Sequence, residues 1–322
     1  MSAARPDRPD GPDVRKVVLV TRRTRLEELV ARYGTLAQAR FYVEHLGADF
    51  GDYLAEDEAY RDALGRTLAA LQPWGRYQRL DRGLLPNFVF APSDIVLALG
   101  QDGLVANTMK YLAGQPLVGL NPEPRRWDGL LLPFRPDDLP RLLPEVAADR
   151  RATQAVTMAE ARMSDGQTLR AVNDFFIGPR SHTSALYDIS HGGQTEFQSS
   201  SGLIVSTGLG STAWIKSIAT GSLAIAQALG GAGEAAAGDG YQPLPWDTAS
   251  LQFAVREPFP SRASQARLVW GRFGREAPLR IRSRMPDAGV VFSDGIESDY
   301  LRFTAGMEVC ISVSDAQGLL VC

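Results

Sequence analysis

Cysteine is almost absent from this sequence of 322 residues, which contains only Cys310 and Cys322. Two cysteines cannot form a disulfide framework or a closed zinc site, so we expect a protein of the reducing cytoplasm. Histidine is equally scarce, and its three copies have no second ligand at a recognised spacing: His45, His182 and His191. The sequence therefore predicts no metal site built from these residue types.

The sequence also lacks a charge excess and any long apolar run. Its formal net charge is −3, with 22% charged residues, which argues against a protein that binds nucleic acid by neutralising phosphates. No apolar segment approaches ~20 residues, so we expect no helix that spans a membrane. Hydrophobic residues make up 44% of the chain, enough for the core of one large domain or two ordinary ones.

The most informative stretch is Pro92–Lys110, where an apolar run breaks into the turn Gly100–Gly103, GQDG. The uninterrupted run Ile95–Leu99 predicts a strand buried on both faces, typical of a parallel α/β sheet. The turn, and the helix expected over Val105–Leu112, lie where such sheets bind ligands, and glycine lets the backbone approach a phosphate. The turn alone is also compatible with an ordinary loop, because Gly and Asp are common turn residues.

Strands and helices alternate on both sides of this stretch. The alternation predicts an α/β domain over residues 14–148 with a doubly wound parallel sheet, after a disordered tail over residues 1–13. The acidic residues of the tail argue against a signal or transit peptide. The expected strands are Lys16–Thr21, Gln78–Asp81, Ile95–Leu99 and Pro116–Leu120, and the other expected helices are Thr24–Ala31, Leu36–Leu46, Tyr53–Leu71 and Asp137–Ala147.

The pattern then changes, and it predicts a β-rich domain over residues 149–322. Whether the last strands of this domain return to the first domain is left open. One helix, Thr212–Leu229, interrupts the strands. Gly230–Gly240 has low complexity and predicts a mobile loop, so its Asp239 is not taken as a site residue. The expected strands are Gln154–Ala161, Thr168–Ile177, Ala185–Ile189, Leu203–Thr207, Leu251–Val255, Leu279–Ser283 and Val309–Val313.

Three polar motifs stand out in the second domain. Asn173 and Asp174 lie at the head of an apolar strand, where they either bind a ligand or form an Asx turn. The glycine-rich turn Thr207–Thr212 precedes the helix, and its amides, hydroxyls and helix N-terminus suit a phosphate or a ribose. The hydroxyl residues at its end serve equally well as N-caps. Asp294 follows another apolar run, at the expected end of a strand.

Taken in order, these segments resemble the signature of the NAD kinase family. That signature is a GGDG turn in an α/β domain, an Asn-Glu pair, a glycine-rich T-x-x-GSTA turn and a late Asp-Gly. The matching segments are GQDG at 100–103, ND at 173–174, TGLGSTA at 207–213 and DG at 294–295. The closer resemblance is to the mitochondrial-type branch, through Trp214, Val118–Pro133 and Arg256–Pro258. It covers nearly the whole chain.

The resemblance implies an ATP-dependent NAD kinase, which transfers the γ-phosphoryl group of ATP to the adenosine ribose 2′-hydroxyl of NAD and gives NADP. A hydroxyl is a poor nucleophile at neutral pH, so a carboxylate should accept its proton, and Asp102 matches the family's base. Mg²⁺ is expected with the ATP phosphates. The family also implies a homodimer or higher homo-oligomer, with neither nucleic acid nor membrane as a partner.

The same resemblance assigns binding roles around Asp102. Asn173 and Asp174 match the pair that holds the NAD ribose, while Thr212, Ala213 and Ser217 match positions that line the nicotinamide-side or adenine pocket. Trp214 replaces a tyrosine and is suited to stack on a ring. The full set expected to bind NAD or ATP is Gly100, Gln101, Gly103, Asn121, Asn173, Asp174, Thr207, Gly210, Ser211, Thr212, Ala213, Trp214, Ser217 and Asp294.

Several residues depart from the family pattern. Gln101 replaces the second glycine of GGDG, and its side chain either obstructs a phosphate or donates a hydrogen bond to it. Leu104 replaces a hydroxyl residue, and Asp174 is shorter than the usual Glu. Two alternatives therefore stand beside an active NAD kinase: a catalytically silent dinucleotide-binding sensor, and a related kinase with a different hydroxyl substrate. The pair Asn173 and Asp174 argues against a lipid kinase, which has no use for a ribose clamp.

Overall fold

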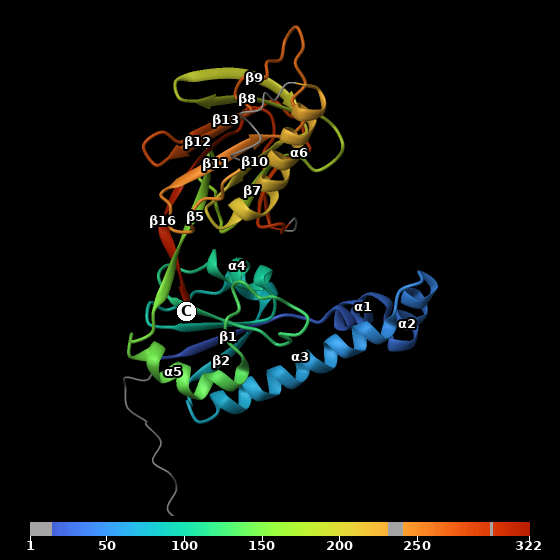
Figure 1. Cartoon of the computed structure of the whole chain (residues 1–322), viewed down its shortest axis with the longest axis vertical. Coiled ribbons are helices and arrows are strands. Elements are labelled where there is room, and N and C mark those ends of the chain that lie inside the picture. The colour runs from blue at the N-terminus through green and yellow to red at the C-terminus, as the bar shows by residue number, and fades with distance from the viewer. Residues whose placement is uncertain (1–14, 231–240, 297–298) are drawn as a thin grey trace, which may run out of the picture. The chain divides into compact units, whose positions relative to one another are not determined.

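The computed structural model describes residues 15–230, 241–296 and 299–322. They fold as two compact units, of which one takes in the chain up to Gln154 together with Leu319–Cys322 and the other is Ala155–Gly318 (Figure 1). The chain passes from the first unit to the second within β5 (Thr153–Met163) and returns within β16 (Glu308–Val321). Each unit is described in turn.

A parallel sheet forms the centre of the first unit. Its strands lie in the order β2-β1-β3-β4, and the end of β16 adds to β4 through Leu319 and Leu320. Both β1 and β3 are buried over their whole length, and for β3 the apolar run predicted this burial. The doubly wound α/β fold predicted for this part of the chain is confirmed. The bounds are β1 Val17–Thr21, β2 Tyr77–Asp81, β3 Ile95–Leu99 and β4 Pro116–Leu120.

The long helix α3 links the sheet to two smaller helices. Its 22 residues, Phe50–Leu71, extend over about 33 Å, because an α-helix rises 1.5 Å per residue. Its later turns pack Tyr60 and Leu71 against the strands, while its start packs on α1 and α2 through Phe50 (Figure 1). The remaining helices are α1 Arg25–Tyr33, α2 Leu36–His45, α4 Asp102–Met109 and α5 Leu139–Ala147, with short 3₁₀ helices η1 Arg82–Asn87 and η2 Pro136–Asp138.

The helix after β3 begins earlier than the sequence predicts. The expected range is Val105–Leu112, whereas α4 spans Asp102–Met109. The amides of Leu104 and Val105 both donate to the carbonyl oxygen of Gln101, which closes the first helical turn there. Asp102 therefore lies in the first turn of the helix instead of in a loop before it.

Two β-sheets pack face to face in the second unit. One has the order β16-β13-β8-β9, with β5 paired to both β16 and β6, and the other has the order β12-β11-β10-β7-β14-β15. Their inner faces enclose one apolar core, with Tyr187 and Ile281 from the first sheet against Phe175 and Phe253 from the second. The predicted β-rich fold is confirmed. The bounds are β6 Thr168–Ala171, β7 Asp174–Pro179, β8 Ala185–His191, β9 Gln194–Ser200, β10 Leu203–Ser206, β11 Ser250–Val255, β12 Trp270–Gly274, β13 Leu279–Ser283, β14 Gly289–Ser293 and β15 Tyr300–Arg302.

Two predicted segments in this unit need correction, and three strands were not predicted. The single strand predicted over Thr168–Ile177 breaks at Val172 and Asn173 into β6 and β7, which belong to different sheets. The predicted helix Thr212–Leu229 is shorter, because a 3₁₀ turn (η3, Gly210–Thr212) precedes α6. The strands β9, β12 and β15 were not predicted, since they carry few apolar residues or are very short.

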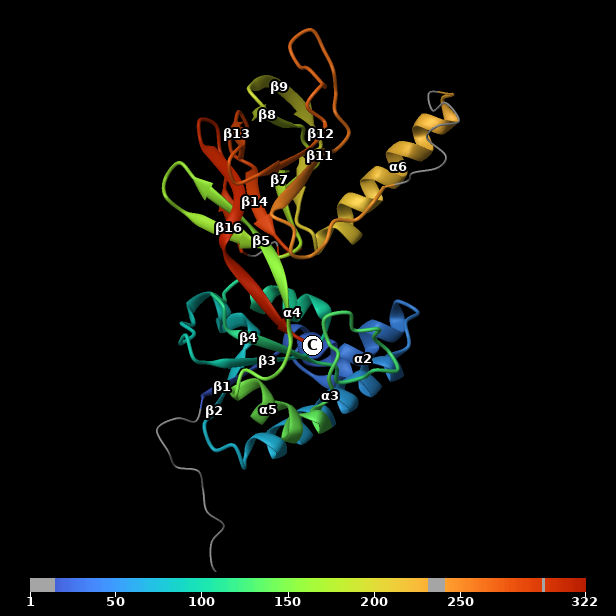
Figure 2. The same ribbon diagram turned by 60° about the vertical axis from the view of Figure 1, so that its left-hand side comes forward.

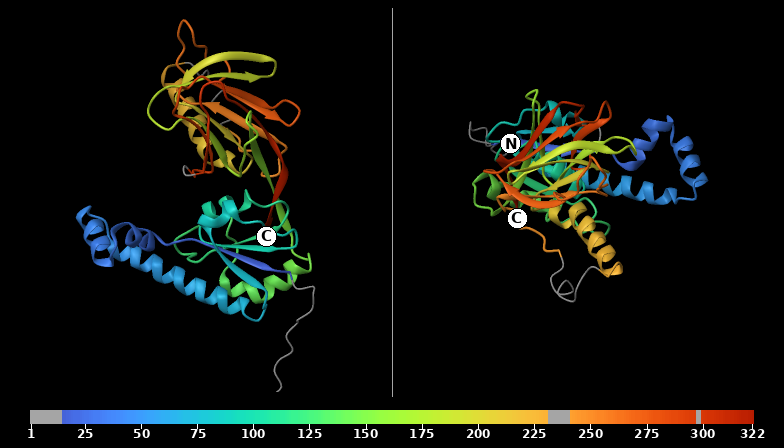
Figure 3. Two further views of the ribbon diagram at one scale, coloured as in Figure 1. Left: turned by 180° about the vertical axis from the view of Figure 1, so that it is seen from behind. Right: turned by 90° about the horizontal axis from the view of Figure 1, so that it is seen from above.

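The helix α6, Trp214–Ala228, is unusual in its exposure. It extends away from the two sheets of its unit (Figures 2 and 3). Ile215 is its buried residue, while Leu223 and Ile225 are exposed. This helix therefore gains little stability from tertiary packing beyond its first turns.

Some predictions concern residues that the structure does not describe. The tail at residues 1–13 and Asp239, with the rest of Gly230–Gly240 after Gly230, lie outside the described residues. In the ranges that are described, no helix combines the length and the apolar composition needed to cross a membrane. Cys310 and Cys322 are both free thiols.

A close approach of two backbone segments at Gly119 generates a stability prediction. A Cβ atom there would lie 1.9 Å from the carbonyl oxygen of Leu131. We expect Gly119→Ala to lower the free energy of unfolding by about 1–3 kcal/mol, as overpacked sites do. The matched control is Gly65→Ala in α3, where no atom lies within 4 Å and helix propensity favours alanine. Urea unfolding measures both, and equal midpoints for the two variants would contradict the close approach.

Candidate functional site

Asp102 lies at the carboxyl end of β3, where parallel sheets bind their ligands. Its Oδ1 accepts a hydrogen bond of 2.7 Å from the amide of Leu131, and the side chain is half-buried. Among the described residues, nothing hydrogen-bonds its second oxygen, Oδ2. A carboxylate fixed through one oxygen and open at the other is suited to accept a proton.

The loop that carries Leu131 is shaped by Asn121. Its Nδ2 donates to the carbonyl oxygen of Trp127 at 3.1 Å, and its Oδ1 accepts from the amide of Glu123 at 3.0 Å. Only 4% of Asn121 is exposed. The predicted binding residue Asn121 thus uses its side chain inside the loop, and it acts on Asp102 by placing the Leu131 amide.

The rest of the GQDG turn leaves its backbone accessible on one side. Gln101 is the N-cap residue of α4, and its side chain makes no capping hydrogen bond. No atom lies within 4 Å of a Cβ placed on Gly103, whereas a Cβ on Gly100 would lie 2.9 Å from Leu104 Cδ2 and 3.5 Å from Arg22 Nε. The start of α4 adds unpaired amides and a partial positive charge to this turn.

In the second unit, Asp294 fixes the backbone of the segment between β6 and β7. Its Oδ1 accepts the amides of Asn173 at 2.6 Å and Val172 at 3.1 Å, and its own amide donates to the carbonyl oxygen of Asp174 at 2.9 Å. Asp294 adopts a φ of 54°, a conformation that few non-glycine residues take. The predicted binding residue Asp294 therefore positions Asn173 and Asp174.

The glycine-rich turn packs directly against the same break. The Thr207 hydroxyl donates to the carbonyl oxygen of Val172 at 2.6 Å, and the Thr207 amide donates to that of Asn173 at 2.9 Å. A Cβ on Gly210 would lie 2.2 Å from the Asn173 oxygen, so only glycine permits this approach. Thr207 and Gly210 thus bring the turn and the pair Asn173–Asp174 together.

The two hydroxyl residues that end this turn do not cap α6. Ser211 is fully buried, and its Oγ donates to the carbonyl oxygen of Gly208 at 2.6 Å and accepts from the amide of Leu244 at 2.9 Å. Thr212 is exposed and donates to Leu209 O at 3.3 Å. The N-cap residue is Ala213, which has no side-chain acceptor. The N-cap interpretation of Ser211 and Thr212 is therefore wrong for α6.

Asp174 begins a row of polar side chains across the second sheet. The register pairs Asp174 with Ser206, Ser206 with Gln252 and Gln252 with Arg272. Asp174, Ser206 and Gln252 are buried, and Asp174 Oδ1 is buried without a hydrogen-bond partner. Burial raises the pKa of Asp174 to about 7, the Ser206 hydroxyl opposes this, and Asp294 adds to it by charge repulsion.

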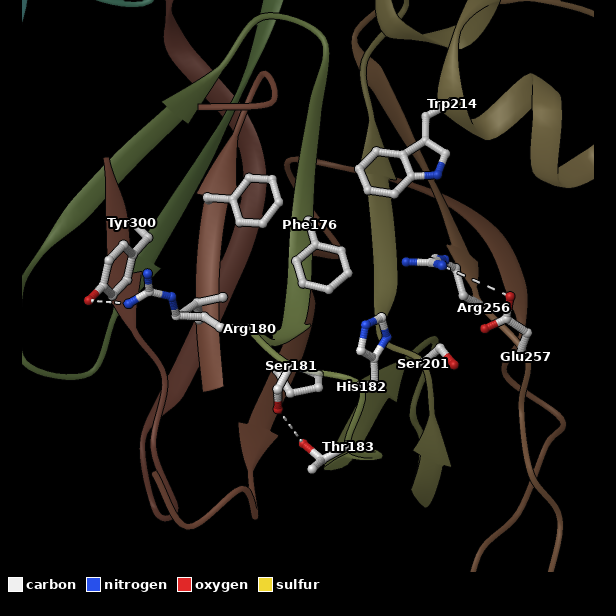
Figure 4. A pocket seen from close by; sticks show the side chains of 13 residues that line it. Phe176, Arg180, Ser181, His182, Thr183, Ser201, Trp214, Arg256, Glu257 and Tyr300 are labelled. Carbon is white, nitrogen blue, oxygen red and sulfur yellow. Dashed lines mark hydrogen bonds and ion pairs between the residues drawn. The ribbon is translucent and has the colours of Figure 1, made fainter. Parts of the chain in front are cut away.

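A pocket of about 500 Å³ opens on the same face of this sheet, where Phe176 follows Asp174 by two residues (Figure 4). The rings of Phe176 and Trp214 are parallel to within 2°, with centroids 6.0 Å apart. Arg180 and Arg256 lie on either side of Phe176. The Arg256 guanidinium lies 5.5 Å from the Trp214 ring. Such a pocket suits an anionic ligand with a planar ring.

The structure divides the predicted site residues into two sets. Gly100, Gln101, Asp102, Gly103 and Asn121 gather in the first unit. In the second unit, Asn173, Asp174, Thr207, Gly210 and Asp294 form one hydrogen-bonded group, and Ser211 bonds beside it to Gly208 and Leu244. Thr212, Ala213, Trp214 and Ser217 lie at and beyond the start of α6. Phe176 and Arg180 were missed, although their spacing from Asp174 along one strand was a usable signal.

No fixed metal centre is found in the described ranges: they contain no group of three or more His, Cys, Asp or Glu side chains placed to hold an ion. Phosphate oxygens of a nucleotide are ligands that Mg²⁺ prefers.

The pKa of Asp174 generates a stability prediction with a definite sign. Its folded value, about 7, exceeds its usual 3.8, so the folded protein binds this proton more tightly and stability falls as pH rises from about 4 to about 7. Asp174→Asn cannot ionise. We expect this variant to be more stable than the wild type at pH 8, by at most about 4 kcal/mol, and similar at pH 4.

Chemical unfolding at the two pH values measures this difference. The exposed Asp287→Asn serves as the matched control and should show no such change with pH. A gap between wild type and Asp174→Asn that is the same at pH 4 and pH 8 would mean that Asp174 titrates normally.

Comparison with known proteins finds similarity in structure and no match in sequence. No protein-family model matches the chain, and no curated protein sequence is similar to it. Among solved structures, it is similar to yeast NADH kinase complexed with NADH, with a TM-score of 0.59, 14% sequence identity, and coverage of 97% of this chain and 84% of that one. At this identity the likeness concerns the fold, and the α/β unit with its β-rich second unit is the fold of that kinase.

Proposed function

We propose that this protein is an ATP-dependent NAD kinase, which phosphorylates the adenosine ribose 2′-hydroxyl of NAD and yields NADP. The observation that carries the proposal is the geometry of Asp102, held by the Leu131 amide through Oδ1 with Oδ2 open, at the carboxyl end of β3. The shared fold with yeast NADH kinase supports it. So do the motifs GQDG, ND and TGLGSTA in their order along the chain.

In this proposal Asp102 is the general base. The ribose hydroxyl attacks the γ-phosphorus of ATP, the bond from that phosphorus to the bridging oxygen of ADP breaks, and Asp102 Oδ2 accepts the hydroxyl proton. The Leu131 amide stabilises the ionised carboxylate before the transfer and fixes its orientation. Mg²⁺ arrives with ATP, and when bound it neutralises charge on the phosphate oxygens.

In this proposal, residues of the second unit bind NAD. Asn173 and Asp174 bind a ribose, and hydrogen bonds from Asp294 fix the backbone of this pair. A ribose hydroxyl would provide the hydrogen-bond partner that the buried Asp174 Oδ1 lacks. The parallel rings of Phe176 and Trp214 would contact a flat ring of the dinucleotide, and Arg256 beside them would contact a phosphate.

Three finer assignments rest on the sequence alone and stay predictions: the first two on the family resemblance and the third on the scarcity of cysteine. They are membership of the mitochondrial-type branch, assembly into a homodimer or higher homo-oligomer, and location in the cytoplasm. The exposed apolar residues of α6, Leu223 and Ile225, are compatible with a subunit contact.

A second candidate function follows from Gln101. A side chain in place of glycine at the phosphate turn is what a dinucleotide-binding sensor that has lost ATP use would carry. Such a protein would bind NAD and form no NADP. A kinase for another hydroxyl substrate is less favoured, because the pair Asn173–Asp174 suits a ribose.

NADP formation from NAD, ATP and Mg²⁺ tests the proposal. We expect turnover by the wild type and a loss of about 10²–10⁴-fold in kcat for Asp102→Asn, which keeps the side-chain shape but cannot accept the proton. The exposed Asp287→Asn is the control and should retain full activity. NAD binding without NADP formation by the wild type would establish the sensor, and an active Asp102→Asn would remove Asp102 as the base.

A further inference from the structure

Arg22 lies beside the GQDG turn, although it belongs to none of the predicted motifs. It directly follows β1, and Gly100 directly follows β3, the neighbouring parallel strand. The register pairs Val20 with Ala98, so both strands end at the same level of the sheet. A Cβ on Gly100 would lie 3.5 Å from Arg22 Nε. The guanidinium therefore packs beside Gly100, close to where a side chain on this residue would lie.

The side chain of Arg22 is held in one position. Only 8% of it is exposed, and its Nη2 donates to Glu56 Oε1 at 2.9 Å while Nη1 donates to the carbonyl oxygen of Arg23 at 2.9 Å. Its guanidinium lies 5.1 Å from the ring of Tyr60, whose hydroxyl bridges the Arg22 amide and the Leu99 oxygen. Little side-chain entropy remains to be lost on binding a ligand.

An ion network connects Arg22 to two further arginine residues. Glu56 also pairs with Arg25, Arg25 pairs with Asp52 at 2.8 Å, and Asp52 pairs with Arg126 at 2.6 Å. Hydrogen bonds from Arg126 and Arg25 hold the pKa of Asp52 at about 2, so this acid stays ionised. Three guanidinium groups thus share two carboxylates in this network.

One hydrogen-bond donor in this network makes no hydrogen bond. Arg22 Nε is buried and has no hydrogen-bond partner. On folding, a buried donor loses its hydrogen bond to water, and without a new partner this loss costs free energy. Such donors are therefore rare in native proteins. Leu104 shields the same side of Gly100, with its Cδ2 2.9 Å from a Cβ placed there, and a leucine side chain can turn aside. The start of α4, with its partial positive charge, lies at the same turn.

We propose that Arg22 binds the phosphoryl donor at the GQDG turn, with its Nε–H donating to an oxygen of the polyphosphate group of a nucleoside triphosphate. This inference rests on the proposed function, for which it names a residue that receives the donor's phosphates. A fixed guanidinium is well suited to phosphate oxygens. It also gives the turn a donor that does not depend on the glycine replaced by Gln101.

Two variants test Arg22 without leaving a buried charge unpaired. Arg22→Lys keeps the ion pair with Glu56 but places a methylene, Cε, where arginine has Nε. The double variant Arg22→Gln with Glu56→Gln removes both charges together, which avoids the large cost of an unpaired buried ion. Arg25→Gln is the matched control, because it removes a guanidinium from the same network and, unlike Arg22, is not among the atoms nearest a Cβ on Gly100.

Steady-state kinetics separates a role in donor binding from a general structural role. We expect the KM for ATP to rise about 10- to 100-fold in both Arg22 variants, the loss typical of a hydrogen bond to a charged group. The KM for NAD should stay within about twofold, since Arg22 is proposed to contact only the donor, and Arg25→Gln should leave both values nearly unchanged. An unchanged KM for ATP in Arg22→Lys and in the double variant would overturn the inference and leave the kinase function intact.

Calorimetric binding without NAD provides a readout that does not require turnover. ATP, inorganic tripolyphosphate and adenosine are titrated into the wild type and the double variant. We expect the double variant to lose affinity for ATP and tripolyphosphate by a similar factor, with adenosine binding unaffected. If the wild type forms no NADP but tripolyphosphate binding depends on Arg22, the site stands and the proposed function fails. Tripolyphosphate binding that is equal in both proteins would overturn the inference.

Discussion

A single hydrogen bond, from the Leu131 amide to Asp102, fixes the acid on which the proposed chemistry depends. Leu131 can reach Asp102 only because Gly119 lets the two backbone segments approach, with no room for a Cβ. Asn121 then closes the same loop through the Trp127 oxygen. The orientation of one carboxylate is therefore set by a strand, a glycine and an amide that all belong to β4 and the loop after it, and not by the turn that carries the acid.

In the second unit, by contrast, several polar residues of the site are buried. Asp294 uses its carboxylate on backbone amides, and Asp174 lies in a buried row with Ser206 and Gln252. Burial of a carboxyl group costs free energy unless its hydrogen bonds are complete, and Asp174 Oδ1 is incomplete. Stability is thus given up at a position where a ligand hydroxyl would restore the missing contact, a common property of binding sites.

Local patterns in the sequence predicted the elements whose causes are local. The run Ile95–Leu99 identified a buried strand because its composition reflects its own burial. The break between β6 and β7 was not predictable in this way, because its cause is Asp294, far away along the chain. The same holds for the site: Asp102 could be selected by its turn, whereas the Leu131 amide and the proximity of Arg22 to Gly100 depend on tertiary contacts.

The strand β16 has a consequence for how the protein is made. Leu319 and Leu320 extend the sheet of the first unit by pairing with Pro116 and Leu117 of β4. A ribosome must therefore synthesise the whole second unit before the first sheet receives its last strand. Until then, the edge of β4 has unpaired backbone groups that can recruit another strand. The nascent chain thus depends on completion, or on a chaperone, for protection of the sheet that carries Asp102.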